Sequence, residues 1–161
     1  MIPALVAGSG SCMLRLVLAV ANRRTSVKDL RDHPPATLGE RFAHALASKD
    51  EAELRCILSP DVTFKALTPG RPWEAKGPNE VLDILFAQWF EDSDHIEALV
   101  SVEGGLVEDR NRVAYRVLVH NRDGDHMLEQ QAYFDVDGDV RISWMNILCS
   151  GYRPRSRPSQ R

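Results

Sequence analysis

Three polar residues in the second half of the chain have side chains suited to acid–base chemistry beside an apolar pocket. Asp94 ends an acidic segment and precedes a run of alternating apolar residues, so its carboxylate is expected at the mouth of a β-sheet. A carboxylate in that position is a candidate general base. Tyr115 and Gln130 lie in later strand-like runs and can donate hydrogen bonds that polarise a substrate carbonyl. We predict all three as candidate catalytic residues.

Each of these residues also has a purely structural explanation. Asp94 belongs to the acidic segment 91–94 and would then be a surface acid or a cap. Tyr115 and Gln130 would satisfy each other or the backbone, as buried polar groups must. Cys149 has no base nearby in the sequence, so we expect a buried structural thiol there rather than a nucleophile.

Helices and short strands are expected before this strand-rich half. Thr37 and Glu40 form a capping box at the start of a first helix. Asp50 begins a short second helix, and Pro78 takes the first position of a third, where its missing N–H costs no hydrogen bond. The intervening strands are predicted over residues 61–67 and 73–76.

Residues 94–152 alternate with a period of two, which is typical of four strands joined by tight turns. Asp123-Gly124 and Asp137-Gly138 are the expected hairpin turns. Counting outward from them places Tyr115 opposite Ala132 and Gln130 opposite Met145, and assigns each side chain to one face of the sheet.

The more apolar face is expected to meet the helices and to enclose a ligand pocket. The predicted pocket residues are Phe42, Trp73, Phe86, Trp89, Tyr115, Gln130, Phe134, Ser143, Met145, Ile147 and Cys149.

The opposite face mixes aromatic, aliphatic and ionic residues, a composition typical of subunit interfaces. We predict a homodimer through this outer face, with an ordinary half-solvated sheet face as the alternative. The predicted interface residues are Arg116, Leu118, Glu129, Tyr133, Ile142, Trp144 and Asn146.

Composition excludes several classes of protein. A 161-residue chain with 43% hydrophobic and 27% charged residues fits one globular domain, and a net charge of -3 argues against nucleic-acid binding. The apolar run 13–21 is too short to cross a bilayer, which predicts no membrane association and leaves secretion as the alternative. Neither a phosphate-binding glycine loop nor a metal-ligand spacing occurs, so we predict no cofactor and no metal.

Cysteine usage and tail composition complete the domain organisation. Three cysteines without CxxC spacing fit reduced thiols and a cytoplasmic location. Residues 1–35 are predicted to be a disordered extension, 36–152 the folded domain, and 153–161 a disordered basic tail.

The element order resembles the nuclear transport factor 2-like superfamily, also called SnoaL-like, over roughly residues 37–152. Two local stretches carry the resemblance: LSPDVTF after a short helix, and LCSGYRP at the end of the last strand. It implies an α+β fold in which three helices wrap a curved mixed or antiparallel sheet into a cone, with an apolar pocket and usually a dimer. The superfamily includes isomerases, dehydratases, polyketide cyclases, epoxide hydrolases and non-catalytic members, so the fold alone does not assign a function.

The resemblance also tests one specific chemistry. Alignment with ketosteroid isomerases puts Phe42 at the oxyanion-hole tyrosine, Ala66 at the general-base aspartate and Gln130 at the protonated aspartic acid. Phe42 cannot donate a hydrogen bond and Ala66 cannot take a proton, so that constellation is not present. Under a register slipped by one residue, Arg116 and Glu129 with Gln131 would line the pocket in an arrangement loosely similar to an epoxide hydrolase site.

Two functions therefore remain open. The first is a protein that binds a small, mostly apolar organic molecule, with cofactor-free isomerase, dehydratase or cyclase activity as its catalytic form. The alternative is a non-catalytic dimerisation or regulatory module. A cavity of several hundred Å³ opening beside Asp94 favours the first function. A pocket filled by Tyr115, Phe134 and Met145 favours the second.

Overall fold

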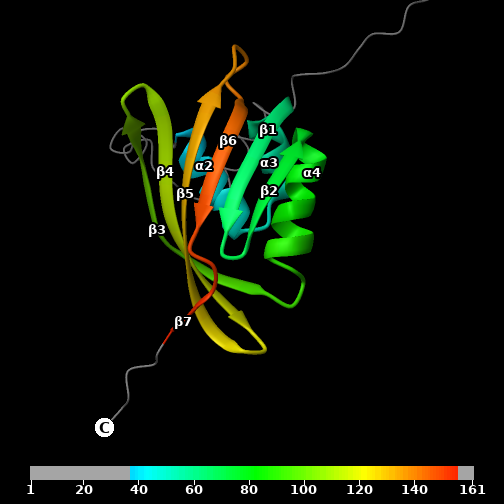
Figure 1. The fold of residues 1–161 in the computed structure, drawn as a ribbon, viewed down its shortest axis with the longest axis vertical. Helices are drawn as coiled ribbons and strands as arrows, with labels where there is room; N and C mark the ends of the chain where they lie inside the picture. Colours follow the sequence, from blue (N-terminus) through cyan, green and yellow to red (C-terminus); the bar gives the residue numbers. More distant parts are fainter. Residues whose placement is uncertain (1–36, 156–161) are drawn as a thin grey trace, which may run out of the picture. The chain divides into compact units, whose positions relative to one another are not determined.

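The computed structural model describes residues 37–155, which comprise helices and one mixed sheet (Figure 1). The helices are α2 (Leu38–Ala47), α3 (Glu51–Ile57) and α4 (Gly77–Asp83), and α4 continues as the π-helix η2 (Ile84–Trp89). The strands are β1 (Leu58–Thr68), β2 (Arg71–Lys76), β3 (His95–Val107), β4 (Arg110–Asn121), β5 (Gly124–Val136), β6 (Ile142–Cys149) and β7 (Arg153–Pro154).

The sheet has the strand order β2-β1-β6-β5-β4-β3, and the short β7 pairs with β5. β1 and β6 are parallel, whereas the other neighbouring pairs are antiparallel. Figure 1 shows α2 and α3 behind the sheet and α4 beside β1 and β2. The predicted α+β fold, a curved mixed sheet wrapped by helices, is confirmed.

Side-chain caps fix the starts of the first two helices. The Thr37 hydroxyl accepts a hydrogen bond from the Glu40 N–H at 3.2 Å, and the Glu40 carboxylate accepts one from the Thr37 N–H at 2.8 Å. Asp50 accepts from the Glu53 N–H at 3.0 Å. Each cap stabilises its helix by about 1 kcal/mol, and both were predicted from the sequence.

Helix α2 lies directly on the strands because its second residue is a glycine. A Cβ at Gly39 would lie 2.8 Å from the Val113 Cβ and 3.0 Å from the Phe134 ring. Phe42 and Leu46 follow at helical spacing, and neither has any exposed surface. The helix therefore fills one end of the inner sheet face with no intervening space.

The predicted cross-strand partners are wrong, but most side chains are on the predicted face. Asn121 pairs with Gly124, so the turn residues are Arg122 and Asp123, and Tyr115 lies opposite Gln130 instead of Ala132. Gln130 in turn pairs with Cys149 instead of Met145. Both shifts are by an even number of residues, which leaves the inward and outward sets unchanged.

A β-bulge reverses the assignment at the start of β6. The register of β5 and β6 shifts between Asp135 and Val136, and the extra residue changes the alternation there. Ile142 consequently has no exposed surface and belongs to the core, so its predicted place on the outer face is wrong. Ser143, predicted in the pocket, is half-buried near the β5–β6 turn, with its hydroxyl 3.4 Å from the Asp135 carbonyl.

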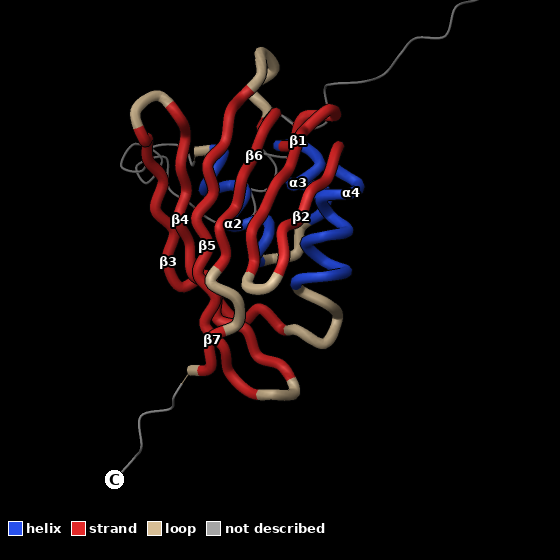
Figure 2. Tube along the Cα trace, in the orientation of Figure 1, coloured by secondary structure: helices blue, strands red, loops and turns tan. Residues whose placement is uncertain are grey.

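The chain continues past the predicted end of the domain. Arg153 and Pro154 form β7, which pairs with Met127 and His126 of β5, and the Arg155 N–H donates to the Asp125 carbonyl at 2.8 Å. The prediction that the disordered tail begins at residue 153 is therefore wrong. Figure 2 shows β7 against the end of the sheet where the β4–β5 hairpin reaches beyond the helices.

Other predictions concern parts of the chain outside the described residues. The predicted extension over 1–35, the apolar run 13–21 and residues 156–161 are among them. Within residues 37–155, no helix is long and apolar enough to cross a membrane. Cys149 is a free, buried thiol, whereas Cys56 is disulfide-bonded, so the prediction of three reduced thiols is wrong at Cys56.

Candidate functional site

A cavity of about 350 Å³ opens at the end of the inner sheet face that α2 does not cover. Its walls come from the β1–β2 turn, η2, the middle of β5 and the segment that joins β6 to β7. The lining residues are Thr68, Pro69, Trp73, Gln88, Trp89, Leu128, Gln130, Cys149, Ser150, Gly151, Tyr152 and Arg153.

A buried tyrosine–glutamine pair lies at the inner end of this cavity. Tyr115 and Gln130 are cross-strand partners, and the Tyr115 hydroxyl donates to the Gln130 Oε1 at 2.6 Å. Burial raises the pKa of the Tyr115 phenol well above its ordinary value, and the nearby Cys149 raises it further. The phenol is therefore a neutral donor at physiological pH, and its hydrogen bond holds the Gln130 amide with Oε1 toward Tyr115.

Two buried side-chain nitrogens have no hydrogen-bond partner within residues 37–155. They are the Gln130 Nε2 and the Trp89 Nε1, and both residues line the cavity. Because Tyr115 donates to Oε1, the unpaired atom of the Gln130 amide is Nε2, which offers donor hydrogens. A buried donor without a partner costs about 1–3 kcal/mol, so native proteins rarely contain one without a reason.

Trp89 is held at the cavity wall by the π-helix and by ring contacts. The Phe90 N–H bonds to the Leu85 carbonyl five residues earlier, which is the π-helical pattern. The Trp89 ring contacts Phe64 and Trp73 at centroid distances of 6.1 and 6.0 Å. Trp73 donates its own ring N–H to Thr68 at 2.8 Å, so its nitrogen is satisfied while that of Trp89 is not. The sequence predicted a buried apolar helix here, not a π-helix.

The rim opposite Trp89 is shaped by a glycine and a tyrosine. Gly151 has a φ of 70°, and a Cβ there would lie 2.8 Å from the Pro69 Cγ. Tyr152 follows and donates its hydroxyl hydrogen toward the Trp89 carbonyl at 2.6 Å. Gly151 and Tyr152, which form the rim segment, are therefore held to the β1–β2 turn by packing and to η2 by a hydrogen bond.

Asp94 is buried just outside this cavity and is not among its lining residues. Its Oδ1 accepts a hydrogen bond from the Asn121 amide at 3.0 Å, and its Oδ2 lies 3.1 Å from the Tyr152 hydroxyl. Burial raises the pKa of the Tyr152 phenol above its ordinary value, and the charge of the nearby Asp94 raises it further. Both carboxylate oxygens therefore position neighbouring groups, and the use of Asp94 as a base stays a prediction.

The structure brings together some predicted pocket residues and separates others. Trp73, Trp89, Gln130 and Cys149 line the cavity. A second set fills the core beside it, with little or no exposure: Phe42, Tyr115, Phe134, Met145 and Ile147. Phe86 lies in a separate surface groove of about 860 Å³ between α3 and the α4–η2 helix, among the acidic residues Glu51, Asp83, Glu91 and Asp92.

Sequence reasoning missed the residues that shape the rim. Gly151 and Tyr152 belong to the stretch LCSGYRP, which entered the sequence analysis only as part of a resemblance. A glycine directly after a strand is the available signal for a positive φ and a close backbone approach.

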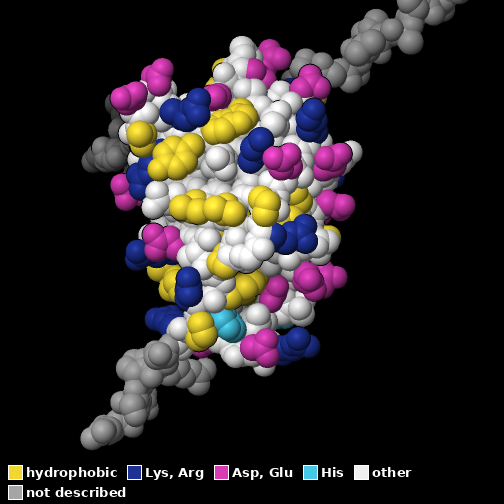
Figure 3. Space-filling view, in the orientation of Figure 1, with side chains coloured by type: hydrophobic (Ala, Val, Ile, Leu, Met, Phe, Trp, Pro, Cys, Tyr) yellow, Lys and Arg dark blue, Asp and Glu magenta, His cyan; other side chains and the backbone are white. Residues whose placement is uncertain are grey.

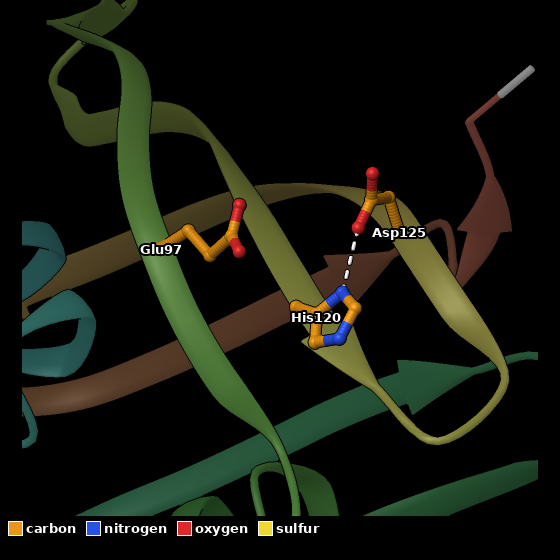
Figure 4. Close-up of side chains that lie close together, drawn as sticks. All are labelled: Glu97, His120 and Asp125. Carbon is orange, nitrogen blue, oxygen red and sulfur yellow. Dashed lines mark hydrogen bonds and ion pairs between the residues drawn. The ribbon is translucent and has the colours of Figure 1, made fainter. Parts of the chain in front are cut away.

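A cluster of metal-ligand type also lies outside the cavity. Ligand atoms of Glu97, His120 and Asp125 are all within 4.8 Å of one another (Figure 4). The three residues come from different strands and have no spacing that a sequence motif would reveal, so the cluster was not visible in the sequence, and the absence of a bound metal stays a prediction. His126, in contrast, is buried on the inner face of the sheet.

Comparison with solved structures identifies the fold. An LEH-like epoxide hydrolase from M. tuberculosis is 16% identical, with a TM-score of 0.52 over 70% of this chain and 80% of its own. A SnoaL-like protein from Mesorhizobium loti is 15% identical, with a TM-score of 0.52 over 68% of this chain and 94% of its own.

A third match was solved with a small molecule bound. It is a protein of ketosteroid isomerase-like fold from Catenulispora acidiphila in complex with trimethylamine, 13% identical, with a TM-score of 0.54 over 73% of this chain and 88% of its own. No protein-family model matches the sequence, and no curated protein is similar enough to count as a relative. At these identities the matches establish the fold and leave the activity open.

Proposed function

We propose that this protein, which has the nuclear transport factor 2-like fold, binds a small and largely apolar organic molecule that carries a hydrogen-bond-accepting oxygen. The observation that carries the proposal is the pair of buried donors, the Gln130 Nε2 and the Trp89 Nε1, without partners in residues 37–155 and beside a cavity of about 350 Å³. A ligand carbonyl or ether oxygen that reached either donor would supply the missing acceptor.

Cavity size and wall chemistry support the same ligand class. A volume of about 350 Å³ is at the small end of the range for ligand pockets. Trp73, Trp89 and Leu128 supply apolar walls, and the Arg153 side chain at the rim is the only formally charged one among the lining residues that the structure describes. A neutral ring system with one polar group therefore suits the cavity better than a sugar or a phosphate ester.

The catalytic form of this proposal is an acid–base isomerase, dehydratase or cyclase that needs no cofactor. Gln130 would polarise a carbonyl, and Tyr115 would support it by holding the amide oxygen. Asp94 would act as the base only if it gave up its contacts with Asn121 and Tyr152. Simple binding requires no such rearrangement.

A matched pair of ligands tests the binding proposal. α-Tetralone and tetralin have the same bicyclic skeleton, but only the ketone offers an acceptor, so quenching of tryptophan fluorescence should show about tenfold tighter binding of the ketone. Gln130→Leu should weaken this preference and leave the Trp89 Nε1 as the remaining donor, whereas Gln131→Leu, on the other face of the same strand, should keep the preference in full. Equal binding of both compounds by the unmodified protein would refute the donor argument.

The outer sheet face supports a homodimer as a second proposed property. Leu67 and Leu148 are cross-strand partners on β1 and β6 with 52% and 58% of their surface exposed. The Arg110 guanidinium stacks 4.6 Å from the Trp144 ring, and Arg116 pairs with Glu129 at 2.9 Å.

Figure 3 shows hydrophobic side chains in rows across this face, between charged groups. Aromatic, aliphatic and arginine side chains are the residues that subunit interfaces favour, and a second copy of the chain would cover them. Sedimentation should then show a dimer that Trp144→Glu dissociates and that Glu74→Gln, at the β2 edge, leaves intact. A Trp144→Glu protein that stays dimeric would exclude this interface.

A further inference from the structure

We propose that Glu97, His120 and Asp125 form a binding site for a divalent transition-metal ion, of which Zn²⁺ is the representative. One side-chain atom from each residue lies within 4.8 Å of the others. Figure 4 shows the three side chains on neighbouring strands, converging on the same side of the sheet. None of them lines the ligand cavity, so the site is independent of the proposed function.

The backbone holds two of the ligands in fixed register. His120 and Asp125 are direct cross-strand partners, one pair in from the β4–β5 turn. The His120 Nδ1 lies 2.7 Å from the Asp125 Oδ1. Cross-strand partners on one face of a hairpin are close enough for their side chains to interact, so the pairing holds these two ligands together.

The third ligand comes from an irregularity in β3. The register between β3 and β4 shifts between Ile96 and Ala98, so Glu97 is the extra residue of a bulge. A bulge re-aims the side chain of the extra residue. Here the carboxylate of Glu97 points toward His120.

The donor set suits a borderline metal ion. One imidazole nitrogen with two carboxylate oxygens is a combination that binds Zn²⁺, and bond lengths of about 2.0–2.2 Å imply ligand atoms about 3.3 Å apart in a tetrahedral site. The present separations bracket that value, since the His120–Asp125 contact is shorter and the widest separation in the cluster is up to 4.8 Å. Small rotations of exposed side chains would close the site, with water as the fourth ligand.

The surroundings of the cluster add one further imidazole. His95 is the β3 partner of His120 in the register. The carboxylates of Glu97 and Asp125 supply oxygen ligands of the kind that a divalent cation binds. The exposure of Glu97 and His120 lets an ion enter directly from solvent.

Calorimetric titration of tag-free protein with zinc chloride tests this site. One Zn²⁺ should bind per chain, and His120→Ala and Glu97→Gln should each weaken binding at least tenfold. His44→Ala is the matched control, because His44 is an exposed histidine on α2 outside the cluster, and it should bind zinc like the unmodified protein.

Imidazole NMR spectra give a second measurement that does not depend on the variants. Zinc should shift the ring signals of His120 and leave those of His44 in place. Zinc affinity unchanged by His120→Ala, or ring shifts at His44 without shifts at His120, would overturn the proposal.

Discussion

The two ends of the inner sheet face share strand β5 and differ in what covers them. At one end, α2 presses Gly39 against Val113 and Phe134, and the buried Phe42 ring contacts Tyr115. At the other end, Gln130 and its neighbours face η2 and the β6–β7 segment across a cavity. The cavity therefore depends on the layer that covers the sheet, because β5 contributes Phe134 to the covered end and Leu128 and Gln130 to the open end.

The two ends also differ in how their polar groups are satisfied. Glu40 and Thr37 cap each other at the covered end. The open end contains both of the buried side-chain nitrogens that lack a partner in residues 37–155. The close-packed end therefore contributes stability, whereas the end with unpaired hydrogen-bond donors can bind a ligand. This is the usual division between a protein core and a binding site.

The largest expected effect tests the covered end. Phe42→Ala should lower the free energy of unfolding by about 3–5 kcal/mol, because it removes a ring with no exposed surface from a close-packed region. Leu128→Ala at the cavity wall should cost less, about 2 kcal/mol, because that side chain already borders empty space. Urea unfolding measures both, and equal losses would contradict the contrast between the ends.

A glycine at the rim gives the next largest effect. Gly151→Ala forces a side chain into a left-handed conformation and against Pro69, which should cost about 1–3 kcal/mol and weaken α-tetralone binding. Gly138→Ala is the control, since a Cβ there meets nothing within 4 Å. If both variants unfold at the same urea concentration as the unmodified protein, the rim is not held as described.

The covered end could largely be predicted from the sequence. Thr37 and Glu40 are a local capping signal, and Phe42 and Leu46 recur at helical spacing on a segment with no competing signal. Alternation along β4 and β5 placed Val113, Tyr115 and Gln130 inward even though the predicted β4–β5 turn was one residue too late. Moving that turn by one residue shifts the pairing by two residues, which leaves each side chain on the same face.

The open end could be predicted only in part from the sequence, because its geometry depends on irregular backbone. The π-helix that presents Trp89 and the positive φ of Gly151 each redirect the backbone locally. The sequence placed Trp73, Trp89, Gln130 and Cys149 in the pocket, but a periodic pattern carries no information about such irregularities, so the rim at Gly151 and the Glu97 cluster had to come from the structure.

A smaller effect distinguishes the hydrogen bond of the Tyr152 hydroxyl from the packing of its ring. Tyr152→Phe keeps the ring against Phe90 and His126 but removes the hydroxyl bonded to Trp89 and near Asp94. We expect a loss of about 1–2 kcal/mol, since the Trp89 carbonyl loses its hydrogen-bond donor and the Asp94 carboxylate loses a polar neighbour. Tyr133→Phe, on the outer face, should change stability by less than about 0.5 kcal/mol. Equal effects would mean that the hydroxyl does not fasten the rim.

Alkaline pH should reveal the two buried phenols through a smaller and gradual change. The pKa values of Tyr115 and Tyr152 are raised mainly by burial, so both phenols stay protonated in the folded protein after the unfolded chain begins to lose protons. Their contribution to stability is complete below the unfolded tyrosine pKa of about 10 and falls above it by up to about 1.4 kcal/mol per pH unit for each phenol. Tyr115→Phe should therefore be less stable at neutral pH yet lose stability less steeply between about pH 10 and 11. Tyr133→Phe should keep the full slope, and a Tyr115→Phe slope as steep as that of the unmodified protein would show that Tyr115 ionises freely in the fold.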